Sequence, residues 1–346
     1  MNFANILLAW FDENHRDLPW RGESDPYKIW VSEIILQQTR VVQGIAYYHN
    51  FLAHFPDIKA LATAPEDDVL KVWQGLGYYS RARNMHAAAQ SIMENHNGKF
   101  PHNYQEIRKL KGIGDYTAAA IGSIAFNLPY PAVDGNVLRF ISRHFGIFDN
   151  IALNSTRKKI EEICTKHLPP KHAGRYNQAL MEMGAIQCTP KNPHCETCPF
   201  AESCYALRHL QVTVLPIKEL QIHIKDRFFN YLIYLYENQT IIQQRTGNDI
   251  WKGLFEFPLV ETENDNFNID DYLSKNGIAT AEKPMLWFQK KHVLTHQNIH
   301  AKFWLIPLLK MPETDGNQQI VNLTQLKDFA VAKITQEAIG RLDGQL

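Results

Sequence analysis

Four of the five cysteines fall within seventeen residues, and this cluster constrains the chain more than any other feature. Cys188, Cys195, Cys198 and Cys204 have the spacing Cys-x6-Cys-x2-Cys-x5-Cys, and three prolines among them force an irregular loop. Four thiolates this close together can converge on one metal centre. Structural zinc modules usually have short paired knuckles, so the irregular spacing favours a 4Fe-4S cluster over zinc, with these four cysteines as ligands.

The fifth cysteine, Cys164, falls in a helical pattern with Ile160 and Ile163. We expect it to be a core residue, because a free thiol packs like a small hydrophobe. No stretch approaches the twenty apolar residues that a membrane span needs, and the short apolar run Ile6–Trp10 lacks a cleavage site. These features predict a cytoplasmic protein, in which clustered cysteines bind metal rather than form disulfides.

Length and charge set weaker limits. At 346 residues the chain is long enough for two or three compact units. Its 36 basic and 36 acidic residues give a formal net charge of zero. Since a nucleic-acid-binding domain usually carries net positive charge, composition alone gives no indication of DNA binding, and any basic surface must be a local patch.

From residue 3 to about residue 208 the apolar residues recur with helical spacing, interrupted by short Gly, Pro and Asn breaks. This pattern predicts an all-α region. The predicted helices are Phe3–Asn14, Tyr27–Thr39, Val41–His54, Glu66–Trp73, Arg81–Asn95, Tyr104–Leu110, Tyr116–Ala125, Val137–Phe145, Ser155–His167 and Arg175–Ile186.

The pattern changes after the cysteines, where apolar runs become short and strand-like. Phe228–Tyr236 and Thr240–Gln244 flank a short polar turn, which predicts a β-hairpin. We predict an α+β domain over residues 227–346, joined to a helical domain over 1–210 by a linker over 211–226. Its other predicted elements are strands at Trp287–Thr295 and Ile299–Leu309 and helices at Asp270–Lys275 and Thr324–Leu342.

A glycine pair separates two of the predicted helices. Gly112-Ile113-Gly114 forms a turn that residues with side chains do not fit easily, and the next helix begins near Asp115 with its amides exposed. Such a helix start binds phosphate. The glycines could simply separate two helices, but Leu-x-Gly-Ile-Gly-x-x-Thr-Ala before a helix of small residues favours a helix-hairpin-helix that contacts the DNA backbone.

Two carboxylates have surroundings that suggest chemistry. Glu33 falls in the apolar segment Ile29–Leu36, where burial would raise its pKa and make it a proton donor, unless it lies on a solvent-exposed face. Asp134 precedes a helix as its N-cap, and the amides there should lower its pKa and keep it ionised. An acid beside a carboxylate is the pairing that cleaves glycosidic bonds.

Together, Trp30–Thr39, Gly75–Tyr79, Leu110–Tyr116, Val133–Asn136 and the cysteine loop resemble the motifs of the MutY family of adenine DNA glycosylases, within the helix-hairpin-helix glycosylase superfamily. The resemblance is close over residues 1–210. It implies a mainly α fold with a six-helix lobe over about 25–130 and an iron-sulfur lobe of 1–24 with 131–210.

The resemblance also implies an activity and a partner. The protein would be a monomeric enzyme of base excision repair that removes adenine mispaired with 8-oxoguanine or guanine from duplex DNA, at the bacterial nucleoid. By position, Glu33 would protonate adenine at N7, and Asp134 would stabilise the oxocarbenium-like sugar. Tyr116 and Asn136 would support Asp134 and the intermediate. The positions that match the adenine pocket are Arg21 and Gln178, and those expected to contact DNA are Gln38, Thr39, Tyr78, Gly112, Gly114, Thr295 and His296.

Tyr116 separates this chain from bifunctional relatives. Those members of the superfamily place a nucleophilic lysine at this position, whose amine forms a Schiff base with the sugar. A phenol here predicts a monofunctional enzyme that uses water. The alternatives are an endonuclease-III-like glycosylase-lyase, which Tyr116 opposes, and a non-catalytic lesion-binding protein, which the presence of both Glu33 and Asp134 opposes.

The tail is similar to the Nudix-like domain with which that family reads 8-oxoguanine. Trp251–Pro258 fits its pattern, but the Glu-rich metal-binding helix of an active Nudix hydrolase is missing, so the resemblance implies recognition rather than hydrolysis. Two positions depart from the family. Leu294-Thr295-His296 replaces an aromatic-Ser-His trio, and Lys111 replaces the usual hairpin proline, which should loosen that turn slightly.

Overall fold

The structure is a computed structural model that describes residues 2–219 and 224–343. It divides into two compact units, one of Met1–Thr63 with Asn84–Gln221 and the other of Ala64–Arg83 with Ile222–Leu346. The segment Ala64–Arg83 of the helical region therefore belongs with the C-terminal part. Within the described ranges, no helix is long and apolar enough to cross a membrane.

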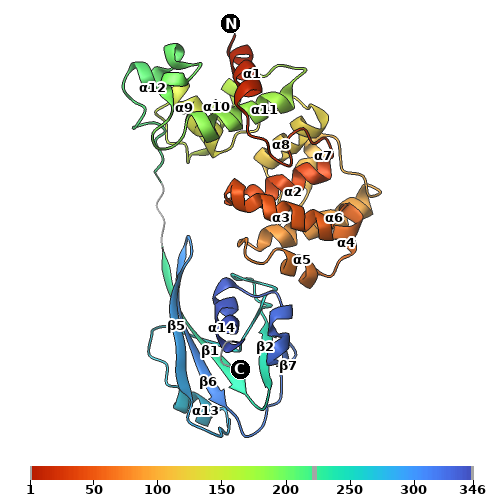
Figure 1. Cartoon of the computed structure of the whole chain (residues 1–346), viewed down its shortest axis with the longest axis vertical. Helices are drawn as coiled ribbons and strands as arrows, with labels where there is room; N and C mark the ends of the chain where they lie inside the picture. Colours follow the sequence, from red (N-terminus) through yellow and green to blue (C-terminus); the bar gives the residue numbers. More distant parts are fainter. Residues whose placement is uncertain (1, 220–223, 344–346) are drawn as a thin grey trace. The chain divides into compact units, whose positions relative to one another are not determined.

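The first unit is built from helices (Figure 1). The helices predicted between residues 3 and 208 are all present, and most of their ends agree with the prediction to within a few residues. The observed helices are α1 (Phe3–Asn14), α2 (Pro26–Leu36), α3 (Val41–His54), α4 (Ile58–Thr63), α5 (Glu66–Val72, in the second unit), α6 (Ser80–Asn95), α7 (Tyr104–Lys109), α8 (Asp115–Phe126), α9 (Gly135–Phe145), α10 (Asn154–His167), α11 (Ala173–Glu182) and α12 (Tyr205–Arg208).

Three helical details differ from the prediction. The short helices α4 and α12 carry too few residues for a periodic signal, and neither was predicted. α2 ends at Leu36 rather than Thr39, because Gln38 adopts a left-handed conformation with φ 56°. The helix predicted to reach Ile186 changes after Glu182 into a π-helical turn, η1 (Met183–Gln187).

Helix α11 lies at the centre of this unit and packs closely on its neighbours. A Cβ atom on Gly174 would lie 2.5 Å from the Ser123 carbonyl oxygen, so α11 can approach α8 only because this residue is glycine. Tyr176, Leu180 and Met183 are fully buried in a core shared with α1, α9 and α10. These contacts hold α11 against the C-terminal part of α8 and against α9.

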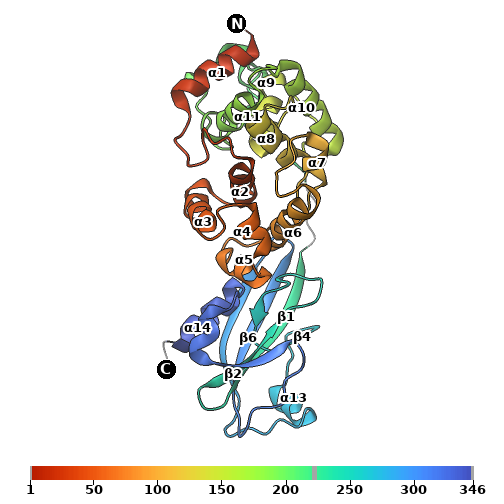
Figure 2. The same cartoon turned by 90° about the vertical axis from the view of Figure 1, so that its right-hand side faces the viewer.

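The second unit is α+β, with two sheets (Figure 2). In the larger one, with order β4-β1-β6-β5, β1 runs parallel to β6 and antiparallel to β4. Helix α13 packs on this sheet through Ile269 and Leu273, against Leu232 and Ile306. The larger sheet consists of β1 (Lys225–Leu235), β4 (Leu259–Thr262), β5 (Met285–Val293) and β6 (Gln297–Pro307). The smaller sheet consists of β2 (Gln239–Gln244), β3 (Phe255–Glu256) and β7 (Gln318–Asn322). The helices are α13 (Ile269–Lys275), the 3-10 helix η4 (Leu323–Asp328) and α14 (Lys333–Asp343).

The predicted β-hairpin is wrong. β1 and β2 meet through a single bridge between Tyr236 and Gln239, but they belong to different sheets. β4 and β6 pair with the two edges of β1, and β2 pairs with β3 and β7 instead. A tight turn between two apolar runs does not by itself decide which strands pair.

The single helix predicted over Thr324–Leu342 is also wrong. The chain forms η4, leaves helical structure at Phe329, and returns to it only at Lys333. Between them, Ala330 accepts a hydrogen bond from the Phe255 amide at 2.8 Å, and Val331 bridges to Phe255. Pairing with β3 therefore overrides the local helical pattern.

Candidate active site and iron-sulfur site

One open pocket of the first unit brings together the predicted catalytic residues. Its walls come from α2 and the turn after it, the start of α8, the loop before α9, and α11. Gly112, Tyr78, Thr295 and His296 do not line it. The predicted site residues that do are Arg21, Glu33, Gln38, Thr39, Gly114, Tyr116, Asp134, Asn136 and Gln178.

Glu33 lies in this pocket with its side chain removed from water. The residue is 8 % exposed, on a helix that is buried on nearly all sides. Burial raises the pKa of the Glu33 carboxyl to about 7, although the Tyr116 hydroxyl lowers it by donating a hydrogen bond to Oε2 at 2.7 Å. The predicted direction of this shift is confirmed. A carboxyl with this pKa can deliver a proton at neutral pH.

Tyr116 is held between Glu33 and α11. Its hydroxyl also lies 3.3 Å from the sulfur of Met181. Burial raises the pKa of this phenol well above its usual value, and the nearby carboxylates of Glu33 and Asp134 raise it further. The hydroxyl therefore stays protonated, and it serves as a hydrogen-bond donor rather than a nucleophile.

Asp134 is the N-cap of α9, as predicted. Its Oδ1 accepts from the amides of Asn136 at 2.9 Å and Val137 at 2.8 Å, and Oδ2 accepts from Asn136 Nδ2 at 2.7 Å. The predicted lowering of its pKa is wrong. Burial raises the pKa of the Asp134 carboxyl by more than these hydrogen bonds and the charge of Arg139 lower it.

A chain of hydrogen bonds leads from Asp134 to the cysteine loop. Asn136 Oδ1 accepts from Arg139 Nη2 at 2.9 Å, and Arg139 Nε donates to the Cys188 carbonyl at 2.8 Å. Arg139 Nη2 also donates to the Gly184 carbonyl. No local sequence pattern indicated this role of Arg139, because these two partners lie 45 and 49 residues away.

A second group of polar side chains lines the pocket between the N-terminal segment and α11. Arg21 Nη1 donates to Gln178 Oε1 at 2.6 Å, which brings the two predicted adenine-pocket residues together. Glu182, 3 % exposed, binds Arg21 Nη2 at 3.0 Å and Arg16 Nε at 2.8 Å. Arg16 and Glu182 were not predicted. A charge within the apolar run of α11 was the available signal, as it was for Glu33 in α2.

The glycine turn between α7 and α8 is present, but only Gly112 of its two glycines requires glycine. Gly112 has φ 81°, and a Cβ atom there would lie 2.6 Å from Asn84 Cβ, so only glycine fits. Gly114 caps α8 in an extended conformation that any residue can adopt, and nothing lies within 4 Å of its Cβ position. Its smallness leaves the start of α8 open toward the pocket.

Within the second unit, Tyr78 lies beside the turn between β5 and β6. Its hydroxyl is 2.8 Å from Thr295 Oγ1, and its backbone is left-handed with φ 47°. A separate cavity is lined by Tyr78, Thr295 and His296. Leu294, Trp251 and His292 line the same cavity. The structure thus brings together Tyr78, Thr295 and His296. These are the predicted DNA-contact residues that belong neither to the first pocket nor to the glycine turn.

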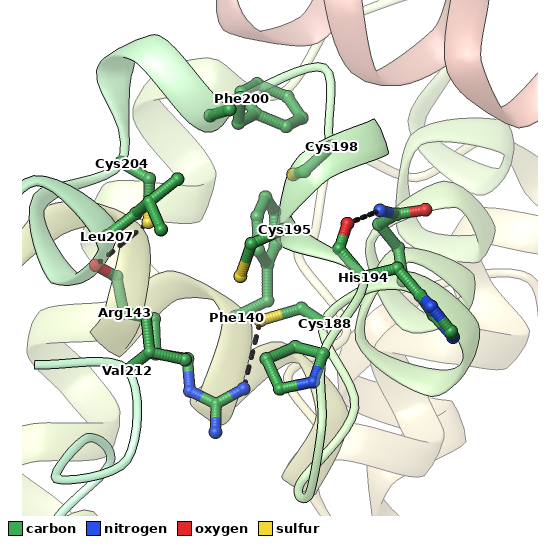
Figure 3. A pocket seen from close by; sticks show the side chains of 13 residues that line it. Phe140, Arg143, Cys188, His194, Cys195, Cys198, Phe200, Cys204, Leu207 and Val212 are labelled. Carbon is green, nitrogen blue, oxygen red and sulfur yellow. Dashed lines mark hydrogen bonds between the residues drawn. The ribbon is translucent and has the colours of Figure 1, made fainter. Parts of the chain in front are cut away.

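The four clustered cysteines surround one space (Figure 3). Apolar side chains such as Phe140 and Phe200 form its walls, and Arg143 Nη1 donates to Cys188 Sγ at 3.4 Å. Four thiols that face one cavity form the ligand set of an iron-sulfur cluster.

Comparison with protein families identifies three regions. Residues 31–170 match the HhH-GPD superfamily of base excision DNA repair proteins, 188–204 match the iron-sulfur binding domain of endonuclease III, and 230–341 match the NUDIX domain. A solved thermostable thymine-DNA glycosylase is 29% identical with a TM-score of 0.55, covering 60% of this chain and 95% of that one. An endonuclease III–DNA complex at 21% identity and TM-score 0.52, with 60% and 94% covered, shares the fold.

Comparison with individual proteins covers nearly the whole chain. The adenine DNA glycosylase of Buchnera aphidicola from Schizaphis graminum is 34% identical over 334 residues, which is 96% of this chain and 91% of that protein. The mouse adenine DNA glycosylase is 38% identical over 218 residues, or 60% and 42% of the two chains. The predicted fold, a helix-hairpin-helix glycosylase followed by a Nudix-like domain, and the predicted 4Fe-4S cofactor are confirmed. The chain belongs to the adenine DNA glycosylases, DNA-binding enzymes of base excision repair within the HhH-GPD superfamily.

Proposed function

We propose that the protein is a monofunctional glycosylase that hydrolyses the N-glycosidic bond of adenine paired with 8-oxoguanine or guanine in duplex DNA, acting as a monomer on the nucleoid. The observation that carries this proposal is that Glu33, whose pKa is about 7, and Asp134 line one pocket. The residue beside Glu33 is the phenol of Tyr116 and not an amine. Such a pocket can donate a proton to a leaving base and face the resulting cation with a carboxylate.

The residues divide the reaction between them. The adenine must leave the duplex, which is easiest at a mismatch. Arg21 and Gln178 would hold the extruded base, and Glu33 would protonate it at N7. As the bond to the sugar breaks, the Asp134 carboxylate would stabilise the oxocarbenium-like sugar, with Asn136 fixing the carboxylate through its Nδ2 bond. Water would then attack the sugar carbon and give its proton to the Glu33 carboxylate left by the first step.

Backbone contacts would position the duplex. The amides at the start of α8, after Gly112 and Gly114, would bind a backbone phosphate. Gln38 and Thr39 line the same pocket and would reach the opposite strand. The 4Fe-4S cluster, held by Cys188, Cys195, Cys198 and Cys204, would supply iron–thiolate bonds that fix the loop beside Arg139 and Arg143.

Water as the nucleophile predicts the fate of the strand. After adenine release the abasic strand should remain intact and be cut only by later alkali, because Tyr116 has no amine to form a Schiff base. The test is incubation with an A opposite 8-oxoguanine duplex, with borohydride added to trap any imine and endonuclease III on its own substrate as the positive control. Trapping as efficient as in that control would contradict the proposal.

The cavity of the second unit is the proposed reader of 8-oxoguanine. His296→Ala should weaken discrimination of 8-oxoguanine from guanine opposite adenine by about 0.5–1.5 kcal/mol, the loss of one hydrogen bond. Single-turnover rates on the two duplexes measure this. His300→Ala is the matched control, because His300 lies on β6 outside the cavity and pairs with Asp226. An equal change on both duplexes would show that His296 does not read the lesion.

A further inference from the structure

A buried side chain of helix α11 is hydrogen-bonded to the backbone of the loop that leads to Asp134. Asn177 is fully buried, and its Oδ1 accepts a hydrogen bond from the Ala132 amide at 3.0 Å. Its Nδ2 donates to the Tyr130 carbonyl and to Ser123 Oγ, both at 2.8 Å. Two of the three bonds thus hold the backbone of residues 130–132, and the third joins α11 to α8.

This attachment matters because the loop has no secondary structure of its own. Residues 131–134 form neither helix nor strand, and Ala132 is fully buried two residues before Asp134. A buried backbone amide without a partner is costly, so the Asn177 amide determines where this segment can lie. The position of Asp134 then follows from the short extended chain between it and Ala132.

The helix that carries Asn177 is itself fixed at both ends by backbone contacts. One turn before Asn177, Gly174 packs on Ser123, where a Cβ atom would lie 2.5 Å from the carbonyl oxygen. Two turns after it, a Cβ atom on Gly184 would lie 2.5 Å from the Asn136 carbonyl oxygen. α11 therefore cannot slide relative to α8 or to the start of α9.

We propose that Asn177 is a positioning residue for Asp134, setting the distance between the carboxylate and the base-holding wall of the pocket. The neighbouring Gln178, together with Met181 and Glu182, projects from the same helix into the pocket. One helix thereby carries the groups that meet the base and holds the loop whose carboxylate meets the sugar. This inference rests on the proposed function of Asp134.

The test compares Asn177→Ala with Ser123→Ala. Asn177→Ala removes both bonds to the loop, whereas Ser123→Ala removes a bond from the same buried amide but leaves the loop attached. With enzyme in excess over duplex, single-turnover adenine release opposite 8-oxoguanine should fall roughly 10- to 100-fold in Asn177→Ala, because a small misplacement of a reacting group costs this much. In Ser123→Ala it should stay within about threefold of wild type.

Binding and folding are measured beside the rate. Affinity for a duplex with 2′-fluoro-adenosine, whose electron-withdrawing substituent resists base loss, should stay within about threefold of wild type in both variants, with iron content unchanged. An Asn177→Ala rate near that of wild type would overturn the proposal. So would rate losses in the two variants that simply follow their losses in melting temperature, because that pattern indicates a structural role alone.

A second variant covers the case in which Asn177→Ala does not fold. Asn177→Asp keeps an oxygen for the Ala132 amide but replaces the donor to the Tyr130 carbonyl. It should slow release by about tenfold, and a wild-type rate would overturn the proposal. Failure of the wild-type protein to release adenine, or a wild-type rate in Asp134→Asn, would instead refute the proposed function, so the two failures are distinguishable.

Discussion

Replacement of Glu33 by glutamine is expected to lower the single-turnover rate of adenine release by roughly 10²-fold or more, because it removes the transferable proton. The amide keeps the shape of the side chain and can still accept the hydrogen bond that the Tyr116 hydroxyl donates to Glu33. Affinity for the lesion duplex should therefore change little. A loss of rate without a loss of binding is the signature of an interaction made in the transition state.

The measurement needs a control for loss of a carboxylate in general. Glu94→Gln provides it, because Glu94 is exposed on α6 and does not line the pocket. Release by Glu94→Gln should match that of wild type. If Glu33→Gln also keeps a near-wild-type single-turnover rate, Glu33 is not the acid, and the assignment of this pocket as the active site fails.

The wild-type pH profile follows from the same residue. Glu33 must be protonated to act as the acid, so the rate should fall as the pH rises through its pKa of about 7. Asp134 must be ionised to stabilise the cation, so the rate should also fall at low pH. Since burial raises the pKa of Asp134, this acid arm should lie above the usual range for an aspartate. The two arms belong to the coupled pair of carboxyls.

Local sequence patterns were sufficient to predict those parts of the molecule that depend on local structure. The helical periodicity gave α3 its exact bounds, and the apolar surroundings of Glu33 gave the direction of its pKa shift. The β1–β2 hairpin was wrong because pairing in a sheet depends on strands distant in sequence, here β6 for β1 and β7 for β2. Local pattern carries no information about such partners.

The site residues divide in the same way. Glu33 and Asp134 stand out because each is unusual in its own segment. Arg139 and Asn177 are ordinary in theirs, and their roles depend on partners 45 to 54 residues away in the chain. The pKa of Asp134 was misjudged for a related reason. The helix start was visible in the sequence, but the burial of the carboxyl comes from the pocket that other segments close around it.

Replacement of Asp134 by asparagine should also lower adenine release by roughly 10²-fold while leaving binding intact, because it removes the charge that faces the cationic sugar. The amide oxygen can keep the bonds from the Asn136 and Val137 amides, but its NH₂ would face the Asn136 Nδ2 donor, so binding and iron content must be measured as checks.

The pH profile of Asp134→Asn distinguishes this explanation from simple damage. The acid arm should vanish, since the group that titrates there is gone. The alkaline arm should remain but move to lower pH, because the charge of Asp134 raises the pKa of Glu33 in the wild type and the variant lacks it. Rates measured across pH 5 to 9, roughly two units on either side of the Glu33 pKa of about 7, would reveal both changes. A profile that keeps its wild-type acid arm at a uniformly reduced rate would mean that another group titrates there and that Asp134 does not stabilise the sugar.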